Sequence, residues 1–572
     1  MCVCRPLHRE KGLFGTAQHT PYMSSITDSH VNVKVTPVSG HSMSHRNTLT
    51  GKVGTLIPVL VEEVCPNSRM HLQTSFSVKL PPLASETFAN IDYRLEAFFV
   101  PHRLLCNSAT PIICGQNRLR EGLQEGAQYF FPIFNVNTQD PTTLSEVQAE
   151  FKPGTLADYL GYRGLPNNFI QQAEDNYHPV LPFYAYHLIW DYWYRNKLVQ
   201  KSIFDENYAT LNSTPIARSP MSTFTKNNYI LNLSEYTTAD SSKAFADGSS
   251  IFTLRQRNFD SDYFTTATLS PQLGVAQSVK LPVQNTQGTM SIASLRAANS
   301  LQQFAERNNL AGIDDVNYYK AMYGAHLDYG VAQHPVCLGS VSVPIYVNGI
   351  FQNGENSKQT NNPFMSVGTQ YGSAGVNETS VVIKDFTANE FGYIFVLGSL
   401  VPRVSYSSGT RRYLSHHLLG NNTGADFANP LLQNVGPQPI YNWEFEASTP
   451  FVQDTPLFGY QTRFAEWMSH PDEVHGEFID GRSLDSFVLQ RSFNHSVAGI
   501  SSSFLQIPTN YLDQIFAVTP QQDTGFSYWV DMLHKWNVSS PVQDFVIPSL
   551  QNPAYEHGQD VNIRKNGAPM ID

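Results

Sequence analysis

The stretch that most constrains the fold is residues 55–105, where apolar and polar side chains alternate. Two segments within it, 72–80 and 91–97, follow a period of two, which is typical of strands that bury one face and wet the other. Ahead of them, residues 55–61 are almost continuously apolar and indicate a strand covered on both faces. Proline-containing breaks separate the three segments. The front of the chain therefore predicts an antiparallel β-sheet.

Later segments repeat the strand pattern between long excursions. Strands are predicted at 340–347, 380–386 and 392–406, and the last is long and apolar, as a central strand would be. The excursions cover residues 107–180, 201–290 and 407–458. Because structureless loops of such length are uncommon, we expect 201–290 to carry small elements of its own. Strand groups parted by insertions indicate a mainly β chain, a barrel or sandwich with elaborated loops.

Two segments have helical spacing. In residues 181–200, aromatic and aliphatic side chains recur every three to four positions behind a proline suited to a first turn. Residues 291–312 have an apolar stripe, with Ser291 able to cap the start and Gly312 able to close the end. The aromatic helix could offer a platform for bases or sugars, but a core or interface role is more common. Five aromatic residues, one of them from a later segment, are assigned to a core or an interface: Tyr186, Trp190, Trp193, Tyr194 and Trp467.

The composition favours burial between subunits. Only 15% of the 572 residues are charged, against roughly a quarter in typical soluble domains, and 12% are aromatic. Interface cores lose Lys and Glu and gain Tyr, Phe and Trp, so a homo-oligomer explains both values. A large, well-filled monomer is the alternative.

The net charge of −11 is unevenly placed. Residues 1–52 carry six Lys or Arg against two acids, so this segment is +4 and the remainder is −15. A basic start that is rich in Gly, Ser and Thr indicates an N-terminal arm that meets nucleic acid, or else a solvated tail.

No pattern for catalysis or metal binding is found in the sequence. The six cysteines form no disulfide scaffold, and the usual phosphate-loop, dinucleotide, zinc-protease and nucleophile-elbow motifs are missing. Glu62 and Glu63 are neighbours on a strand and point to opposite faces, whereas glycosidase carboxylates face each other across a cleft. One cluster of His and acidic residues has a spacing that fits no standard zinc or calcium site: His470, Asp472, Glu473, His475 and Glu477. We expect no enzymatic activity, no cofactor and no metal.

The start of the chain lacks the apolar stretch of a signal peptide, and no run of about 18 apolar residues is present. We therefore expect no membrane insertion, and a protein made in a reducing cytoplasm.

Five blocks of sequence carry a family resemblance. They are LIPVLVEEVCP with DYRLEAFFVPHRLL (56–105), LPFYAYHLIWDYWYRNKLVQ (181–200), LRQRNFDSDYFTTATLSPQLGVAQSVKLPV (254–283), SIASLRAANSLQQFAERNN with HPVCLGS (291–340), and FGYIFVLGSLVPRVSY with YQTRFAEWMSHPDEVHGEF (391–478). On these blocks, which follow the family's order, the chain resembles the major capsid proteins of microviruses. These are small icosahedral single-stranded DNA phages, and the gokushovirus type is the most similar.

The resemblance implies an eight-stranded antiparallel jelly-roll β-barrel with long insertions that contain a few helices. It implies self-assembly into a T=1 shell around circular single-stranded DNA, with residues 1–52 as an interior arm and 53–572 as one jelly-roll domain. The implied partners are a DNA pilot protein, an internal scaffolding protein, a small basic packaging protein and a host surface receptor bound through surface loops. The virion would assemble in the cytoplasm of the bacterial host.

In such a shell the genome would be held by sequence-independent phosphate contacts and by bases stacked on aromatic rings. The basic residues assigned to phosphate contact are Arg5, Arg9, Lys11, Lys34, Arg46, Lys52, Arg564 and Lys565.

The chain also departs from the family. The turn Pro66-Asn67-Ser68 stands where the family often has Gly-Asp. Only about eight residues connect the 254–283 block to the 291–312 helix, a length typical of a plain connection. Gokushoviruses commonly have a long insertion at this place, which builds the protrusion at the threefold axis. The extra length lies at 201–253, where we expect any surface knob.

Two other functions stay open on the sequence. A carbohydrate-binding or glycan-cleaving β-sandwich would suit the aromatic and Asn-rich loops. A non-viral nucleic-acid-binding protein would suit the basic start but not the acidic total charge.

Overall fold

The computed structural model of the protein divides into two compact units, and the fold below is that of residues 40–540. The other unit joins residues 1–39 to 541–572. The structure describes residues 39–85, 87–113, 128–135, 141–162, 177–204, 229–237, 245–270, 296, 334–351, 370–415, 437–446, 457–493, 499–516 and 526–542.

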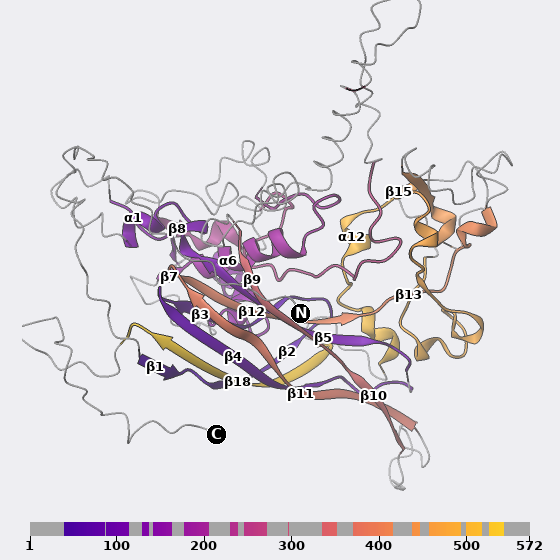
Figure 1. The fold of residues 1–572 in the computed structure, drawn as a ribbon, viewed down its shortest axis with the longest axis horizontal. Coiled ribbons are helices and arrows are strands. Elements are labelled where there is room, and N and C mark those ends of the chain that lie inside the picture. Colours follow the sequence, from indigo (N-terminus) through magenta and orange to yellow (C-terminus); the bar gives the residue numbers. More distant parts are fainter. Residues whose placement is uncertain are drawn as a thin grey trace, which may run out of the picture. The chain divides into compact units, whose positions relative to one another are not determined.

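The central strands pair in mirror order along the chain (Figure 1). The strands are β2 (His45–Gly51), β3 (Ile57–Val64), β4 (Ser68–Lys79), β5 (Ile91–Pro101), β9 (Val336–Pro344), β11 (Gln370–Ala388), β12 (Gly392–Pro402) and β18 (Tyr528–Ser540). The first of them pairs with the last, β2 with β18, and then β3 pairs with β12, β4 with β11 and β5 with β9, all antiparallel. A ribbon of paired strands folded over in this way is the connection order of a jelly roll. The described chain is therefore mainly β with antiparallel sheets, as predicted.

From β2 to β5 the strands alternate between two sheets. One sheet has the order β1-β18-β4-β11-β10, with β2 also on β18, where β1 is Ser39–Ser42 and β10 is Tyr346–Phe351. The other has the order β3-β12-β5-β9. The prediction that the front strands form one sheet is wrong, because β4 lies in the first sheet while β3 and β5 lie in the second. The prediction that 392–406 contains a central strand is confirmed, since β12 lies between β3 and β5.

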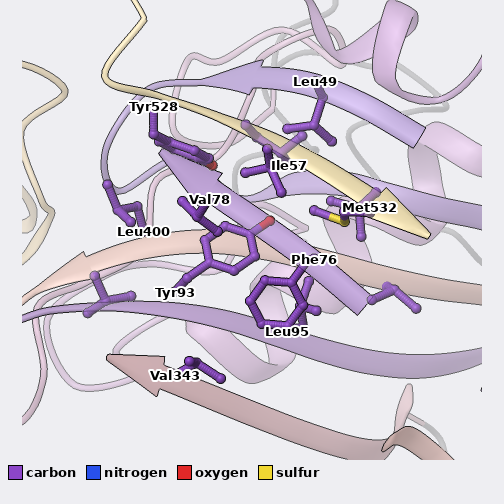
Figure 2. Packing of buried hydrophobic residues seen from close by; sticks show 14 of the residues in the cluster. Leu49, Ile57, Phe76, Val78, Tyr93, Leu95, Val343, Leu400, Tyr528 and Met532 are labelled. Carbon is purple, nitrogen blue, oxygen red and sulfur yellow. The ribbon is translucent and has the colours of Figure 1, made fainter. Parts of the chain in front are cut away.

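The main hydrophobic core lies between these two sheets. Phe76 of β4 and Tyr93 of β5 meet there with their ring centroids 5.5 Å apart, and Tyr528 of β18 packs against Tyr93 (Figure 2). Trp536 of β18 is fully buried in the same core. Each such side chain stabilises the fold by about 1.5–3 kcal/mol through burial. The period of two in the sequence therefore marks the faces that the two sheets turn toward each other.

The far face of the β3-β12-β5-β9 sheet is covered by the insertions. Phe395 of β12 and Phe98 of β5 pack there against Tyr184 and Phe183 in a second core. This double coverage explains why β12 reads as a continuous apolar run. The elements of these insertions are η2 (His102–Leu104), α1 (Ala109–Ile113), β6 (Ile133–Asn135), α3 (Pro141–Glu150), α4 (Leu156–Tyr159), β7 (Tyr177–Pro179), α6 (Leu181–Ile189), the π-helical turn η4 (Trp190–Tyr194), β8 (Ile230–Asn232) and η5 (Leu233–Tyr236).

A third core, which includes Phe264, Phe445 and Phe504, joins residues 263–267 to the last third of the chain. The small elements of this last third are β13 (Ser405–Tyr406), η9 (Arg412–Ser415), β14 (Gln438–Tyr441), η11 (Asn442–Glu444), β15 (Leu457–Gln461), η12 (Ala465–Trp467), β16 (Asp472–Glu473), η13 (Gly476–Phe478), η14 (Asp485–Phe487), β17 (Gln490–Arg491), α12 (Ser502–Leu505) and η15 (Tyr511–Ile515).

Three sequence predictions on elements need comment. The helix expected over 181–200 ends earlier, at the π-helical turn that closes at Tyr194. The helix expected at 291–312 lies outside the described residues, apart from Arg296. Residues 39–51 of the expected arm are instead strands β1 and β2, at the edge of a sheet. Among the described helices, none has the length and hydropathy that a membrane crossing needs.

Candidate nucleic-acid groove and assembly surfaces

The polar face of β5 is covered by the insertion that contains residues 254–260. Arg94 forms a bidentate contact with Asp260, at 2.7 and 2.5 Å. Glu96 accepts a hydrogen bond from Arg257 at 2.6 Å and a second one from the Tyr194 hydroxyl. Burial, followed by the Glu96 charge, raises the pKa of Tyr194 well above its usual value. Alternation alone would place this polar face of β5 in water. In the structure the face instead packs against an insertion.

The predicted aromatic residues divide between the core and the surface. Tyr186 is fully buried, and its hydroxyl donates to the Leu56 carbonyl at 2.8 Å. Trp190 is buried and donates to the Gln256 carbonyl at 2.9 Å. Tyr194 is half-buried, whereas Trp193 is 44% exposed and Trp467 is 58% exposed. Tyr186 of α6 therefore belongs to the core. Trp467, in the last third of the chain, is exposed enough to contact another molecule.

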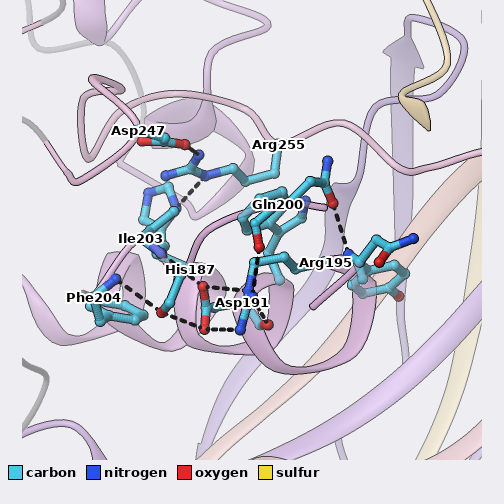
Figure 3. A network of polar contacts seen from close by, with 12 residues as sticks. His187, Asp191, Arg195, Gln200, Ile203, Phe204, Asp247 and Arg255 are labelled. Carbon is cyan, nitrogen blue, oxygen red and sulfur yellow. Dashed lines mark hydrogen bonds and ion pairs between the residues drawn. The ribbon is translucent and has the colours of Figure 1, made fainter. Parts of the chain in front are cut away.

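A polar network fixes α6 to the insertion behind it (Figure 3). Arg255 donates to the His187 ring at 3.0 Å and to Asp247 at 2.5 Å. Burial, followed by the Arg255 charge, lowers the pKa of His187 well below its usual value, so the ring stays neutral. Asp191, one turn after His187, accepts a backbone hydrogen bond from Ile203 at 2.9 Å. These contacts hold the insertion in place and leave no reactive pair open to a substrate.

The cluster of His and acidic residues after residue 470 is bound by arginines. Asp472 accepts from Arg403 at 2.6 Å, and Glu473 accepts from the Arg411 Nε at 2.8 Å. Burial opposes ionisation of Glu473, but the hydrogen bond and charge of Arg411 outweigh it and lower the pKa of Glu473. Among the described residues, no three His, Cys, Asp or Glu side chains are placed to share a metal ion.

Three members of the cluster, His470, Glu473 and His475, line a cavity of about 380 Å³ in the last third of the chain. Tyr413 and Trp467 line the cavity too, and are 57% and 58% exposed. Their chain neighbours Leu414 and Met468 are 48% and 62% exposed. Tyr413 and Trp467, which share the cavity, together with their exposed chain neighbours Leu414 and Met468, are called the assembly patch below. Trp, Tyr and Met are enriched at protein interfaces, which suits contact with another chain.

A larger groove of about 1170 Å³ runs along the outer edge strands β2 and β3 and against residues 149–161. Its charged lining consists of Arg46, Lys52 and Lys152 against Glu62 and Asp158, and the exposed His45 at the start of β2 also lines it. Its volume exceeds the roughly 300–1000 Å³ of a typical small-molecule pocket, and it follows two strands. An extended polymer therefore fits its dimensions better than a compact ligand.

The groove is anchored by contacts across its walls. Arg46 donates to Asp531 of β18 through two nitrogens at 2.6 Å, and Thr48 donates to the same carboxylate at 3.0 Å. The Tyr159 hydroxyl donates to the Thr50 carbonyl at 2.7 Å and ties α4 to β2. These contacts tie β2 to β18 on one side and to α4 on the other.

One end of the groove is aromatic. Trp529 of β18 points away from the core and lines the groove together with Phe526, which is 41% exposed. Their ring centroids are 5.8 Å apart, edge to face. In the sheet, Trp529 lies opposite Thr50 of β2 on one side and Lys79 of β4 on the other. This end of the groove therefore has two aromatic rings, Phe526 exposed and Trp529 half-buried.

Two of the predicted phosphate-contact residues, Arg46 and Lys52, come together in this groove. The other six lie outside the described residues: Arg5, Arg9, Lys11, Lys34, Arg564 and Lys565. Sequence reasoning missed Trp529 and Phe526. The missed signal was the alternation of buried and exposed residues over 528–540, which marks β18 and places Trp529 on its outer face.

The sequence is similar throughout to phage capsid proteins. A profile of the family described as capsid protein (F protein) matches residues 29–291 and 283–545. Capsid protein VP1 of Chlamydia phage 1 is 23% identical over 608 aligned positions, covering 90% of this chain and 96% of the relative. Capsid protein VP1 of Bdellovibrio phage phiMH2K is 22% identical over 521 positions, covering 85% and 91%.

Proposed function

Because the chain belongs to the capsid protein (F protein) family of phages and so is a structural capsid protein, we propose that it assembles as a T=1 icosahedral shell around circular single-stranded DNA. The observation that carries the proposal is the mirror-order strand pairing of β2, β3, β4 and β5. It builds a two-sheet subunit from the two ends of the chain, with long insertions free to contact neighbours. A closed shell needs such a self-associating unit.

The surface composition supports burial of this subunit by its own copies. The assembly patch exposes a tryptophan, a tyrosine, a methionine and a leucine, although monomeric proteins rarely leave large contiguous apolar surfaces in water. Tryptophan and tyrosine anchors dominate the binding energy of protein interfaces. In the proposed shell, these side chains are covered by adjacent copies of the chain.

The genome is proposed to lie against basic residues that contact phosphates without regard to sequence. Arg46 and Lys52 supply two such contacts from the groove. Residues 1–38, which precede the first strand and carry Arg5, Arg9, Lys11 and Lys34, are proposed as an interior arm. The proposed arm is thus shorter than 1–52, because β1 and β2 belong to the sheet.

The remaining partners follow from the family resemblance. We propose a DNA pilot protein, an internal scaffolding protein and a small basic packaging protein as partners in assembly, and a host receptor bound through surface loops such as 201–253. The mature location is the virion, and assembly takes place in the host cytoplasm. The chain is proposed to act without enzymatic activity and without a cofactor, by self-association alone.

Particle analysis tests the proposal. The full chain, expressed with the phage's other capsid components, should give particles of megadalton mass by light scattering, with nuclease-protected single-stranded DNA inside. Cryo-electron microscopy of these particles should show T=1 symmetry. A stable monomer that binds glycans and packages no DNA would contradict the shell and favour the carbohydrate-binding alternative.

A further inference from the structure

We propose that the aromatic end of the groove beside β2 is a binding site for single-stranded DNA, in which Trp529 and Phe526 stack on unpaired bases. The inference rests on the proposed function, since it takes the ligand from the shell's cargo. It goes further by committing to one site, two stacking residues and a single-stranded ligand.

The two rings lie outside the core between the sheets. Trp529 is on the outer face of β18, where its alternation partners Asp531, Leu533 and Lys535 are exposed or half-buried. Phe526 meets it edge to face and is 41% exposed. Neither ring is required by the core between the sheets, which is filled from the opposite face by Val530 and its neighbours. Two aromatic rings are therefore available to a ligand.

Charged side chains lie near the two rings. Lys79 lies opposite Trp529 on β4, at a spacing where cross-strand side chains are close neighbours. Lys52 and Lys152 line the groove itself, where Glu62 and Asp158 are the acidic residues and Arg46 is paired with Asp531. Single-strand binding sites combine a basic groove that tracks phosphates with aromatic rings on which bases stack. Both parts are present along this edge of the sheet.

Stacking on these rings favours single-stranded over duplex DNA as the ligand. Stacking on a side-chain ring needs an unpaired base, whereas a duplex presents its backbone and groove edges. The groove is lined by edge strand β2 on one side and by residues 149–161 on the other, and its aromatic end offers rings that only unpaired bases can stack on. The ligand class is therefore single-stranded DNA, read without sequence preference.

Oligonucleotide binding by the full-length chain tests the site. The probe is fluorescein-labelled oligo(dT), measured by anisotropy, with tryptophan emission followed in parallel. Trp529→Leu and Phe526→Leu should each weaken binding about tenfold, and Trp529→Leu should lose the base-dependent quenching of tryptophan emission. Phe88→Leu is the matched control, because Phe88 is 72% exposed on a different connection, and it should bind as the wild type does.

Salt dependence separates stacking from charge. Lys52→Gln should reduce the slope of log K against log salt by about 0.7, the value for one phosphate contact on a single strand. Trp529→Leu should leave that slope unchanged, because it removes no charge. The wild type should bind duplex DNA of the same length more weakly than oligo(dT). Trp529→Leu and Phe526→Leu should bind that duplex with the same affinity as the wild type.

The outcomes distinguish this site from the shell itself. If no DNA-containing particle forms from the wild-type chain, the proposed function fails. If particles form while Trp529→Leu and Phe526→Leu bind oligo(dT) like the wild type, only the stacking site is overturned. Variants that bind oligo(dT) normally but fail to assemble would show Trp529 to be a subunit contact, which also overturns the site.

Discussion

Arg257 donates to Glu96 at 2.6 Å across a separation of 161 residues in the chain. The two side chains are only 13% and 16% exposed. Glu96 is on the polar face of β5, and Arg257 belongs to the insertion laid over it. The pair therefore fastens an excursion of the chain to the sheet that the excursion departs from.

Breaking this pair should loosen the insertion. Replacing Arg257 with Met leaves the Glu96 carboxylate largely buried without its guanidinium, so we expect a loss of about 2–4 kcal/mol in the free energy of unfolding. Urea denaturation of the unassembled subunit measures it. The control is Arg69→Met, whose partner Asp385 is 3.4 Å away with both side chains more than half exposed, and which should cost less than about 1 kcal/mol. Equal losses in the two variants would contradict the structural role of the pair.

Subunit stability should fall in mild acid because of His534. Burial, with His45 as a smaller contributor, lowers the pKa of His534 to about 4. A histidine in the unfolded chain titrates near 6.5, so the unfolded state binds more protons between these values. The contribution of His534 is therefore complete above pH 6.5 and is lost as the pH falls toward 4.

The variant His534→Gln should remove the share of this dependence that His534 carries. Between pH 7 and pH 5 the wild type should lose about 2 kcal/mol more stability than the variant. Chemical denaturation at both pH values gives the comparison. Asn537→Gln, an exposed change on the same strand, is the control and should keep the wild-type dependence. The same slope in His534→Gln as in the wild type would show that other groups carry the acid sensitivity.

The hydroxyls of the buried tyrosines should differ sharply in their contribution to the free energy of unfolding. Among the described residues, the buried hydroxyls of Tyr93 and Tyr528 have no hydrogen-bond partner. The Tyr186 hydroxyl donates to Leu56 O and accepts from Arg255 N, both at 2.8 Å. We expect Tyr93→Phe and Tyr528→Phe to be neutral or slightly stabilising, whereas Tyr186→Phe should cost about 2–4 kcal/mol by stranding two backbone groups. Thermal unfolding of the three variants ranks them, and a large loss in Tyr93→Phe would reveal a hydroxyl partner.

Two truncations should separate the arm from the sheet. Deleting residues 1–38 should leave the subunit folded but reduce the DNA content or heat resistance of particles. Deleting residues 1–51 also removes β1 and β2, which leaves one edge of β18 unpaired and invites aggregation. Solubility and thermal unfolding of the subunits, with the DNA content of the particles, distinguish the two. Normal particles from the shorter deletion would show that the arm is passive.

Alternation in the sequence predicted strands but not their neighbours. The period of two in β4 and β5 shows which side chains are buried, and the structure confirms both strands. It carries no information on pairing, because β4 finds β11 and β18 far along the chain. Local patterns thus placed β3, β4 and β5 in one sheet, although long-range pairing divides them between two.

The edges of the structure were the hardest part to predict. Strands β1 and β2 read SGHSMSHRNTLTG, with so few apolar residues that the segment looks like a tail. An edge strand with little buried surface gives a weak alternation signal. The groove could be predicted only through the charges of Arg46 and Lys52. Its aromatic end depends on which strand lies beside β2, and only the pairing with β18 brings Trp529 there.

The mirror pairing of the strands also determines when each pair can form during synthesis of the chain. Arg46 and its partner Asp531 are 485 residues apart, so their pairing waits for almost the whole chain. At roughly 5–20 residues per second, a ribosome needs on the order of half a minute to a minute and a half to make that length. Throughout this time β4 lacks one neighbour, and non-local pairing of this kind is slow even afterwards. A nascent chain of this kind must be protected from premature association with its own copies. We therefore expect folding in the host cell to depend on chaperones, although the finished subunit does not need them to stay folded.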